Sequence, residues 1–243
     1  SRPMKRIIEP LQKMNVSVID NEGLLPIKIR NENKKHIPIN YTLNIGSAQV
    51  KSCLLLAAFN IKGTTRIIEK ISSRDHTEIM LKYLGADLKK EKNTISLTSP
   101  NFLKPKDIIV PGDFSSAAFI IVAVLLSQNS KVKIKDVGLN FYRVGLLDVL
   151  KKMKAKITIT NKRRFSGELV GDIEVKSSKL IATSVNKNLS PRLIDEYPIL
   201  FVAAAYAKGI SIFQGLDELK FKESNRLKSM ANALLDGGVK LNL

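Results

Sequence analysis

Polar clusters at the expected starts of helices are the residues best suited to chemistry. Gly46-Ser47-Ala48-Gln49 precedes the run Val50 to Leu56, and Ser72 to Glu78 contains Arg74. The first N–H groups of a helix lack intrahelical partners and favour anions, so Ser47 and its neighbouring amides could hold a phosphate. Arg74 could bind the phosphate through two parallel hydrogen bonds, which Lys cannot reproduce. Both clusters also fit ordinary helix starts, Ser47 as an N-cap and Ser72 to Glu78 as a capping box.

Two later clusters combine acids with cations. Asp195-Glu196-Tyr197-Pro198 precedes a strongly apolar helix, where acids are favoured by the helix dipole alone. A partly buried carboxylate at that point could instead act as a general base, because burial raises its affinity for a proton. In Lys222-Glu223-Ser224-Asn225-Arg226, helical spacing would place Lys222, Glu223 and Arg226 on one side of a helix. That grouping suits a charged substrate, and the alternative is a solvated run of charges.

Other features give weaker signals. Gly112 to Ala117 predicts a tight turn followed by a helix cap. Arg2, next to Pro3, carries no functional signal of its own. Cys53 falls on the apolar face of its helix, so we expect a buried and inert thiol. The sequence has no P-loop, no dinucleotide fingerprint and no Cys/His pattern for zinc, which predicts chemistry without a metal or a cofactor.

The elements that must position these clusters form a repeat. Amphipathic helices are expected around Ile7 to Met14, Met80 to Leu84, Leu146 to Met153 and Leu227 to Leu235. The points just after these helices, Val16, Ala86, Ala155 and Val239, are separated by 70, 69 and 84 residues.

Each complete unit of the repeat has the same order of elements. A first helix (Ser47 to Phe59, Ser115 to Leu126, or about Pro198 to Lys208) precedes a short alternating strand (Thr65 to Glu69, Lys131 to Val137, or Ile210 to Phe213), and the amphipathic helix follows. A further alternating stretch comes next, as in Val16 to Ile19 or Lys156 to Thr160. The pattern predicts an α/β protein of packed βαβαβ-like repeats, divided near Pro111-Gly112.

Composition narrows the class of protein. The 243 residues contain 40 Lys and Arg against 22 Asp and Glu, a net charge of +18 that favours an anionic partner. The cations are scattered, aromatic residues make up 6% of the chain and Trp is absent, which disfavours a nucleic-acid-binding module with stacking platforms. The apolar runs are too short to span a membrane. One Cys excludes an internal disulfide and fits a reducing compartment. The chain begins Ser1-Arg2-Pro3 and stops soon after a helix, so we expect both ends to be truncated.

Six motifs in order resemble one family. Ser-Arg-Pro-Met, Ser-Ala-Gln-Val-Lys-Ser, Ser-Arg-Asp-His-Thr-Glu, Gly-Asp-Phe-Ser-Ser-Ala-Ala-Phe, Ile-Asp-Glu-Tyr-Pro-Ile-Leu and Lys-Glu-Ser-Asn-Arg-Leu extend over nearly the whole chain. They are similar to the 3-phosphoshikimate 1-carboxyvinyltransferase (EPSP synthase) family, in its bacterial branch with Ser-Ala-Gln and Asp-His-Thr-Glu. The resemblance implies two domains of βαβαββ repeats, an inside-out α/β barrel fold, joined by a two-stranded hinge that closes on substrate. Residues 1–111 would then be most of one domain and 112–243 about two thirds of the second.

The resemblance also implies the reaction. The family transfers the enolpyruvyl group of phosphoenolpyruvate to the 5-hydroxyl of shikimate 3-phosphate and releases phosphate, in the shikimate pathway to chorismate and the aromatic amino acids. It implies a cytoplasmic monomer without cofactors, metal, nucleic-acid or membrane partners. The nearest alternative is UDP-N-acetylglucosamine enolpyruvyltransferase, which shares the fold and the donor. That enzyme usually has a reactive loop Cys, whereas Cys53 is expected on an apolar helix face.

Roles follow residue by residue from the resemblance. Around shikimate 3-phosphate it implies Ser47, Ala48, Gln49, Arg74 and Lys222, together with Asp195, which would take the proton of the 5-hydroxyl. Around phosphoenolpyruvate it implies Arg2, Gln49 and Arg226. Glu223, with Lys222 nearby, would handle the proton at the methylene carbon.

One residue departs from the family pattern, since Asn225 stands where the family has Asp. We expect the departure to cost a local hydrogen bond or a cap rather than the reaction. Further groups for both substrates would come from segments beyond this chain, so we expect the chain alone to be inactive.

Overall fold

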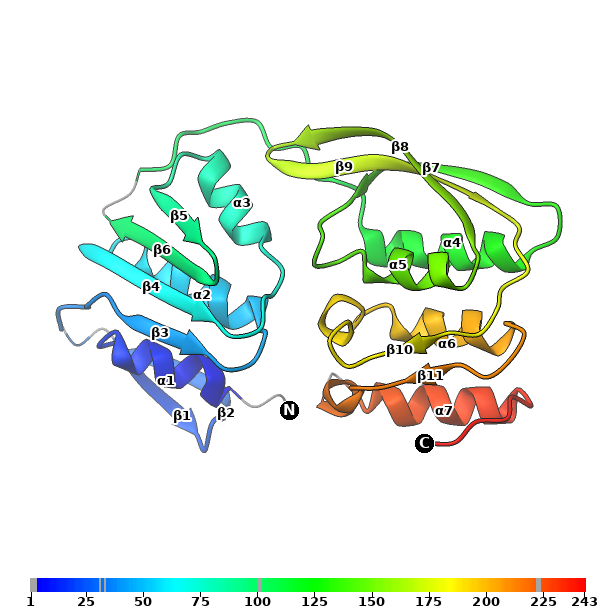
Figure 1. The fold of residues 1–243 in the computed structure, drawn as a ribbon. Coiled ribbons are helices and arrows are strands. Elements are labelled where there is room, and N and C mark those ends of the chain that lie inside the picture. The colour runs from blue at the N-terminus through cyan, green and yellow to red at the C-terminus, as the bar shows by residue number, and fades with distance from the viewer. Residues whose placement is uncertain (1–3, 31, 33, 100–101, 222–223) are drawn as a thin grey trace. The chain divides into compact units, whose positions relative to one another are not determined.

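The chain folds into two compact units. The computed structural model describes residues 4–30, 32, 34–99, 102–221 and 224–243. Unit 1 comprises Ser1–Asp107 and unit 2 comprises Ile108–Leu243, whereas the sequence placed the division between residues 111 and 112. Figure 1 shows the elements of each unit.

Unit 1 contains one complete copy of the repeat. Its elements are α1 (Lys5–Lys13), β1 (Ser17–Asn21), β2 (Leu24–Arg30), β3 (Asn40–Leu43), α2 (Ala48–Ala58), β4 (Gly63–Glu69), α3 (His76–Tyr83), β5 (Leu88–Glu91) and β6 (Thr94–Ser99). The run β3-α2-β4-α3-β5-β6 is a βαβαββ unit, whose strands form one sheet in the order β3-β4-β6-β5. Strands β3 and β4 are parallel, and the other neighbours are antiparallel. The crossover helix α2 packs on β4 and β6, as expected for parallel strands joined by a helix.

Unit 2 repeats this order with a reduced first strand. Its elements are α4 (Phe114–Leu126), β7 (Lys131–Gly138), α5 (Gly145–Lys152), β8 (Lys156–Phe165), β9 (Glu168–Lys176), β10 (Ser184–Val185), the 3₁₀ helix η1 (Ser190–Arg192), α6 (Tyr197–Ala205), β11 (Ile212–Phe213), the 3₁₀ helix η2 (Asp217–Phe221) and α7 (Arg226–Asp236). A three-stranded antiparallel sheet has the order β7-β9-β8. An isolated parallel bridge between Gly112 and Val137 takes the place that β3 has in unit 1. Strands β10 and β11, which lie before and after α6 in the sequence, pair in parallel.

Most elements lie close to where the sequence patterns place them, and the exceptions are short. The strand expected over Ile210 to Phe213 is reduced to β11, and the helix expected to reach Lys208 ends at Ala205. Residues Ile108 to Val110, just before the expected division, form no strand and are exposed.

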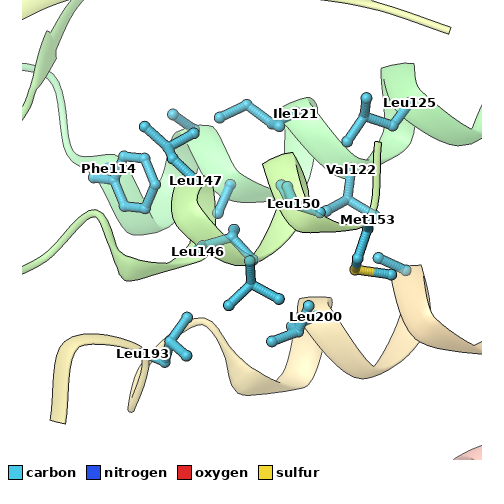
Figure 2. Packing of buried hydrophobic residues seen from close by; sticks show 14 of the residues in the cluster. Phe114, Ile121, Val122, Leu125, Leu146, Leu147, Leu150, Met153, Leu193 and Leu200 are labelled. Atoms are coloured by element: carbon cyan, nitrogen blue, oxygen red, sulfur yellow. The ribbon is translucent and has the colours of Figure 1, made fainter. Parts of the chain in front are cut away.

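Each unit has its own apolar core. In unit 1 the core joins residues of α2, β4, α3 and β6, including Leu54, Ile67, Leu81 and Ile95. In unit 2 the side chains of α4, α5 and α6 interdigitate, as Figure 2 shows for Ile121, Leu146, Leu150, Met153 and Leu200. Helix α4 is apolar along nearly all its length and contacts β7, β9 and α6, although Phe119 and Ile120 remain exposed.

Candidate functional site

The start of α2 has the first-turn amides and polar side chains that the sequence suggested for binding an anion. Ser47 is the N-cap in an extended conformation, and its hydroxyl accepts a hydrogen bond from the Val50 amide at 3.4 Å. Ala48 and Gln49 form the first turn, and the Gln49 side chain is exposed. The N-cap interpretation of Ser47 is therefore confirmed, while its role in binding a ligand stays a prediction.

Arg74 lies half-buried in the loop between β4 and α3. This loop passes close to the turn before α2, because a Cβ added to Gly46 would lie 3.0 Å from the Ile71 Cγ2 atom and 3.2 Å from the Ile71 carbonyl oxygen. Glycine at position 46 thus permits the close approach. Unit 1 brings the loop that carries Arg74 against the turn that leads into Ser47.

The capping box expected over residues 72–78 is wrong. Asp75 is the N-cap of α3, but its side chain makes no capping hydrogen bond. Glu78 instead lies buried, 2.7 Å from the Nζ atom of Lys51. Tertiary contact with a buried cation has replaced the local bond that the sequence pattern favours.

Lys51 forms the centre of a buried ionic cluster that the sequence analysis missed. Its side chain is 0% exposed, and its Nζ atom lies 3.1 Å from Glu69 Oε1 as well as 2.7 Å from Glu78 Oε1. Glu69 Oε1 also accepts hydrogen bonds from the Ser73 amide and hydroxyl, at 3.1 and 2.5 Å. The signal in the sequence was a Lys among the mainly apolar residues Val50 to Leu56.

Burial raises the pKa of the Glu78 carboxyl above its ordinary value of 4.5, and the attraction of Lys51 only partly opposes this. A pKa raised by folding stabilises the protein below the pKa of the unfolded chain, and the stabilisation is lost as the pH rises through the folded value. We therefore expect Glu78→Gln to gain stability relative to the wild type as the pH rises above about 4.5, over the range in which the folded wild type loses the Glu78 proton. Each pH unit by which folding raises the pKa of a group changes the free energy of unfolding by up to about 1.4 kcal/mol. Urea unfolding of both proteins across this range measures the difference, and a difference independent of pH would contradict the expectation.

In unit 2, Asp195 and Arg226 lie together although they are far apart in the sequence. The Arg226 Nη1 atom is 3.3 Å from Asp195 Oδ1, and both side chains are partly exposed, at 25% and 29%. Asp195 precedes α6 and Arg226 opens α7, two helices that pack against each other. The structure thus pairs a carboxylate that could accept a proton with a guanidinium that could hold an anion.

The residue next to Asp195 is anchored by a chain of hydrogen bonds. Glu196, the N-cap of α6, is 3% exposed, and its Oε1 atom accepts from the Ser115 hydroxyl at 2.5 Å. Ser115 also accepts from Arg143, whose Nη2 atom is 2.9 Å from Asp113 Oδ1. Asp113 in turn caps α4 by accepting from the Ser116 amide at 2.8 Å, so the cap expected there is confirmed, whereas Gly112 forms a parallel bridge with Val137 instead of the expected turn. This chain fixes the start of α6 relative to α4.

Three of the expected site residues, Arg2, Lys222 and Glu223, lie outside the described residues. Lys222 and Arg226 were grouped on the assumption of one helix, and that assumption is wrong. Helix α7 begins at Arg226, while Ser224 and Asn225 are not helical. The capping side chain of Asn225 starts the helix at Arg226.

Asn225 keeps the cap that its departure from the family pattern was expected to cost. Its Oδ1 atom accepts a hydrogen bond from the Lys228 amide at 3.0 Å. Asn and Asp are nearly equivalent as N-caps. We expect Asn225→Ala to lower the free energy of unfolding by about 1 kcal/mol and Asn225→Asp to change it by less than about 0.5 kcal/mol. Denaturant unfolding of the three proteins checks this, and equal losses in both variants would exclude the capping role.

Cys53 is less buried than expected. Its side chain is half-buried rather than enclosed in the core. Burial nevertheless raises the pKa of its thiol, so the reactive thiolate is disfavoured.

Two kinds of feature are absent from the described residues. In the part of the chain that the structure describes, no cluster of three or more His, Cys, Asp or Glu side chains could hold a metal ion. Over the same residues, no helix has both the length and the apolar character needed to cross a bilayer.

Comparison with known proteins identifies the family. The sequence model of EPSP synthase (3-phosphoshikimate 1-carboxyvinyltransferase) matches residues 1–242. A 3-phosphoshikimate 1-carboxyvinyltransferase of Gloeothece citriformis is 44% identical over 99% of this chain and 54% of its own length. One of Clostridium tetani is 43% identical over 100% of this chain and 55% of its own length. The chain therefore spans about half the length of the curated relatives it matches.

Solved structures agree with this match. An EPSP synthase from Acinetobacter baumannii superposes with a TM-score of 0.85 at 40% identity, covering 96% of this chain and 53% of that one. The enolpyruvyl transferase NikO from Streptomyces tendae has a TM-score of 0.68 at 16% identity, over 88% of this chain and 51% of its own, and shares the fold. The mixed α/β enolpyruvyl transferase fold inferred from the motifs is confirmed, and the chain belongs to the EPSP synthase (3-phosphoshikimate 1-carboxyvinyltransferase) family.

Proposed function

We propose that a protein containing this chain transfers the enolpyruvyl group of phosphoenolpyruvate to the 5-hydroxyl of shikimate 3-phosphate. Membership of the EPSP synthase family supports the reaction class. The structural observation that carries the proposal is the contact between Asp195 and Arg226 at 3.3 Å, which joins a base for the acceptor with a cation for the donor. The proposed reaction is a step of the shikimate pathway, and the protein that contains this chain works in the cytoplasm.

Unit 1 supplies the groups for the phosphate of shikimate 3-phosphate. The first-turn amides of α2 and the Arg74 guanidinium are donors of the kind that bind phosphate in proteins. Ser47 and Gln49 add side-chain polar groups at the same helix start. Because the turn before Ser47 lies against the loop that carries Arg74, one phosphate can accept hydrogen bonds from both segments.

Unit 2 supplies the base and part of the donor site. Asp195 takes the proton of the 5-hydroxyl while the hydroxyl oxygen attacks C2 of phosphoenolpyruvate. Glu223, with Lys222 nearby, protonates the methylene carbon C3. The resulting tetrahedral adduct loses a proton from C3, and the C2–O bond to phosphate breaks to give the enol ether and inorganic phosphate. Arg226 is proposed to bind the anionic donor through its guanidinium, which has five N–H donors. Arg2 and Gln49 complete the proposed phosphoenolpyruvate contacts.

Phosphate release tests the proposal. The chain would be assayed alone and joined to the segments that the Clostridium tetani relative carries beyond the match, with phosphoenolpyruvate and either shikimate 3-phosphate or UDP-N-acetylglucosamine. We expect release only from the joined protein, and only with shikimate 3-phosphate. Turnover of the nucleotide sugar instead, or a folded joined protein that binds neither acceptor, would overturn the proposal. Size-exclusion chromatography of the joined protein tests the further expectation of a monomer.

A further inference from the structure

Lys51 is the most deeply buried cation that the structure describes, and it lies next to the proposed phosphate site. It follows Ser47 by one helical turn, and its amide donates to the Ser47 carbonyl at 3.2 Å. Its charge is balanced by Glu69 and Glu78, which are 1% and 4% exposed. A fully enclosed cation of this kind cannot itself reach a ligand.

The contacts of Lys51 connect every segment around the proposed phosphate site of unit 1. Glu69 ends β4, and Glu78 lies in the first turn of α3. The Lys51 Nζ atom is also 3.4 Å from the Ser73 carbonyl, which belongs to the residue before Arg74. One side chain on α2 thus contacts the strand, the loop and the helix that together carry Arg74.

Further hydrogen bonds near Lys51 also hold the Arg74 loop in place. The Ser52 hydroxyl lies 2.6 Å from the Thr77 hydroxyl, which links α2 to the start of α3. Ser73 donates both its amide and its hydroxyl to Glu69, so the peptide before Arg74 is held from two sides. The loop is therefore fixed by buried polar bonds, in a part of unit 1 where apolar packing alone would leave its position less defined.

Stability alone does not account for such a cluster. Replacing a buried ion pair with apolar residues of similar volume is often neutral or stabilising, whereas polar bonds impose a particular geometry. A phosphate site needs that geometry, because a displacement of about 1 Å can change a rate or an affinity by about 10²-fold.

We propose that Lys51, with Glu69 and Glu78, is a positioning residue that holds the Arg74 loop against the start of α2 and so preorganises the phosphate site for shikimate 3-phosphate. This inference rests on the proposed function for the identity of the ligand. The fixed loop geometry itself does not depend on that identity, and it can be measured without it.

The kinetic test uses the joined protein described above. We expect Lys51→Met to raise KM for shikimate 3-phosphate by about 10- to 100-fold while KM for phosphoenolpyruvate changes by less than about threefold. Lys62→Met, which removes the same charge at an exposed position of unit 1, is the matched control and should leave both values unchanged. A merely structural role would lower the amount of folded enzyme and leave both KM values alone, so unchanged KM values in Lys51→Met overturn the proposal.

A second pair of variants serves if Lys51→Met does not fold. Glu78→Leu removes one acceptor of Lys51 but leaves Glu69 to balance its charge, and Glu78→Gln keeps an acceptor of the same shape. We expect Glu78→Leu to raise KM for shikimate 3-phosphate and Glu78→Gln to recover most of that loss. Equal values in the two variants would contradict the proposal.

Hydrogen exchange separates this inference from the proposed function. In the 243-residue chain without substrates, we expect Lys51→Met or Glu78→Leu to speed exchange of the Ser73 amide by at least about tenfold, with β6 unaffected. If the joined wild type has no activity but the exchange changes as expected, the proposed function fails and the positioning role stands. If the wild type is active but neither exchange nor KM responds, the positioning role fails alone.

Discussion

Asp195→Asn is expected to lower kcat of the joined enzyme by about 10²- to 10⁴-fold, the usual contribution of a general base. Asn keeps the shape of the side chain and an acceptor for Arg226, which now lies 3.3 Å away, but it cannot take the proton of the 5-hydroxyl. KM for phosphoenolpyruvate should change little, because the cation that would hold it remains. Steady-state phosphate release under saturating substrates measures the effect.

A matched control for this change is Asp217→Asn, also in unit 2. Asp217 is 82% exposed and pairs only with Lys220 among the described contacts, at 2.9 Å. It should retain the wild-type kcat. If Asp195→Asn were as active as this control, another group would have to be the base.

Arg74→Lys is expected to raise KM for shikimate 3-phosphate by about 10- to 100-fold, because a hydrogen bond to a charged group contributes about 1.5 to 3 kcal/mol. Lys keeps the charge but loses the planar pair of donors that matches two phosphate oxygens. The value of kcat at saturation should fall much less. Titration of the joined protein with shikimate 3-phosphate alone gives the affinity directly.

Arg66→Lys makes the same substitution at an exposed position of β4 and should leave the affinity unchanged. An Arg74→Lys protein that binds shikimate 3-phosphate as tightly as wild type would remove Arg74 from the phosphate site. In that case the amides at the start of α2 would have to carry the binding.

The helices and longer strands could be predicted because their signals are local. Periodic apolar residues and turn residues placed α2, α4 and α7 to within one or two residues. The capping box at residues 72–78 failed because its acid, Glu78, is bound by a Lys on another helix. The helical grouping of Lys222 with Arg226 failed because the cap at Asn225 starts the helix later. Local patterns cannot register such distant or competing bonds.

The contacts and roles of the site residues could not be predicted from their spacing in the sequence. Asp195 and Arg226 are in contact only because α6 packs on α7, and nothing in their spacing indicates that pairing. Their roles came from resemblance to a family, as did that of Arg2. The Lys51 cluster was missed for the same reason, since Glu69 and Glu78 lie on elements that only the fold brings close to Lys51.

The βαβαββ unit of Asn40–Ser99 has a consequence for how the chain is made. All four strands of its sheet come from one uninterrupted segment, so no pairing waits for residues synthesised much later. Contacts that are short-range along the chain close quickly and at low entropic cost. During synthesis the whole sheet can therefore form once Ser99 has left the ribosome, before residues 108–243 have emerged.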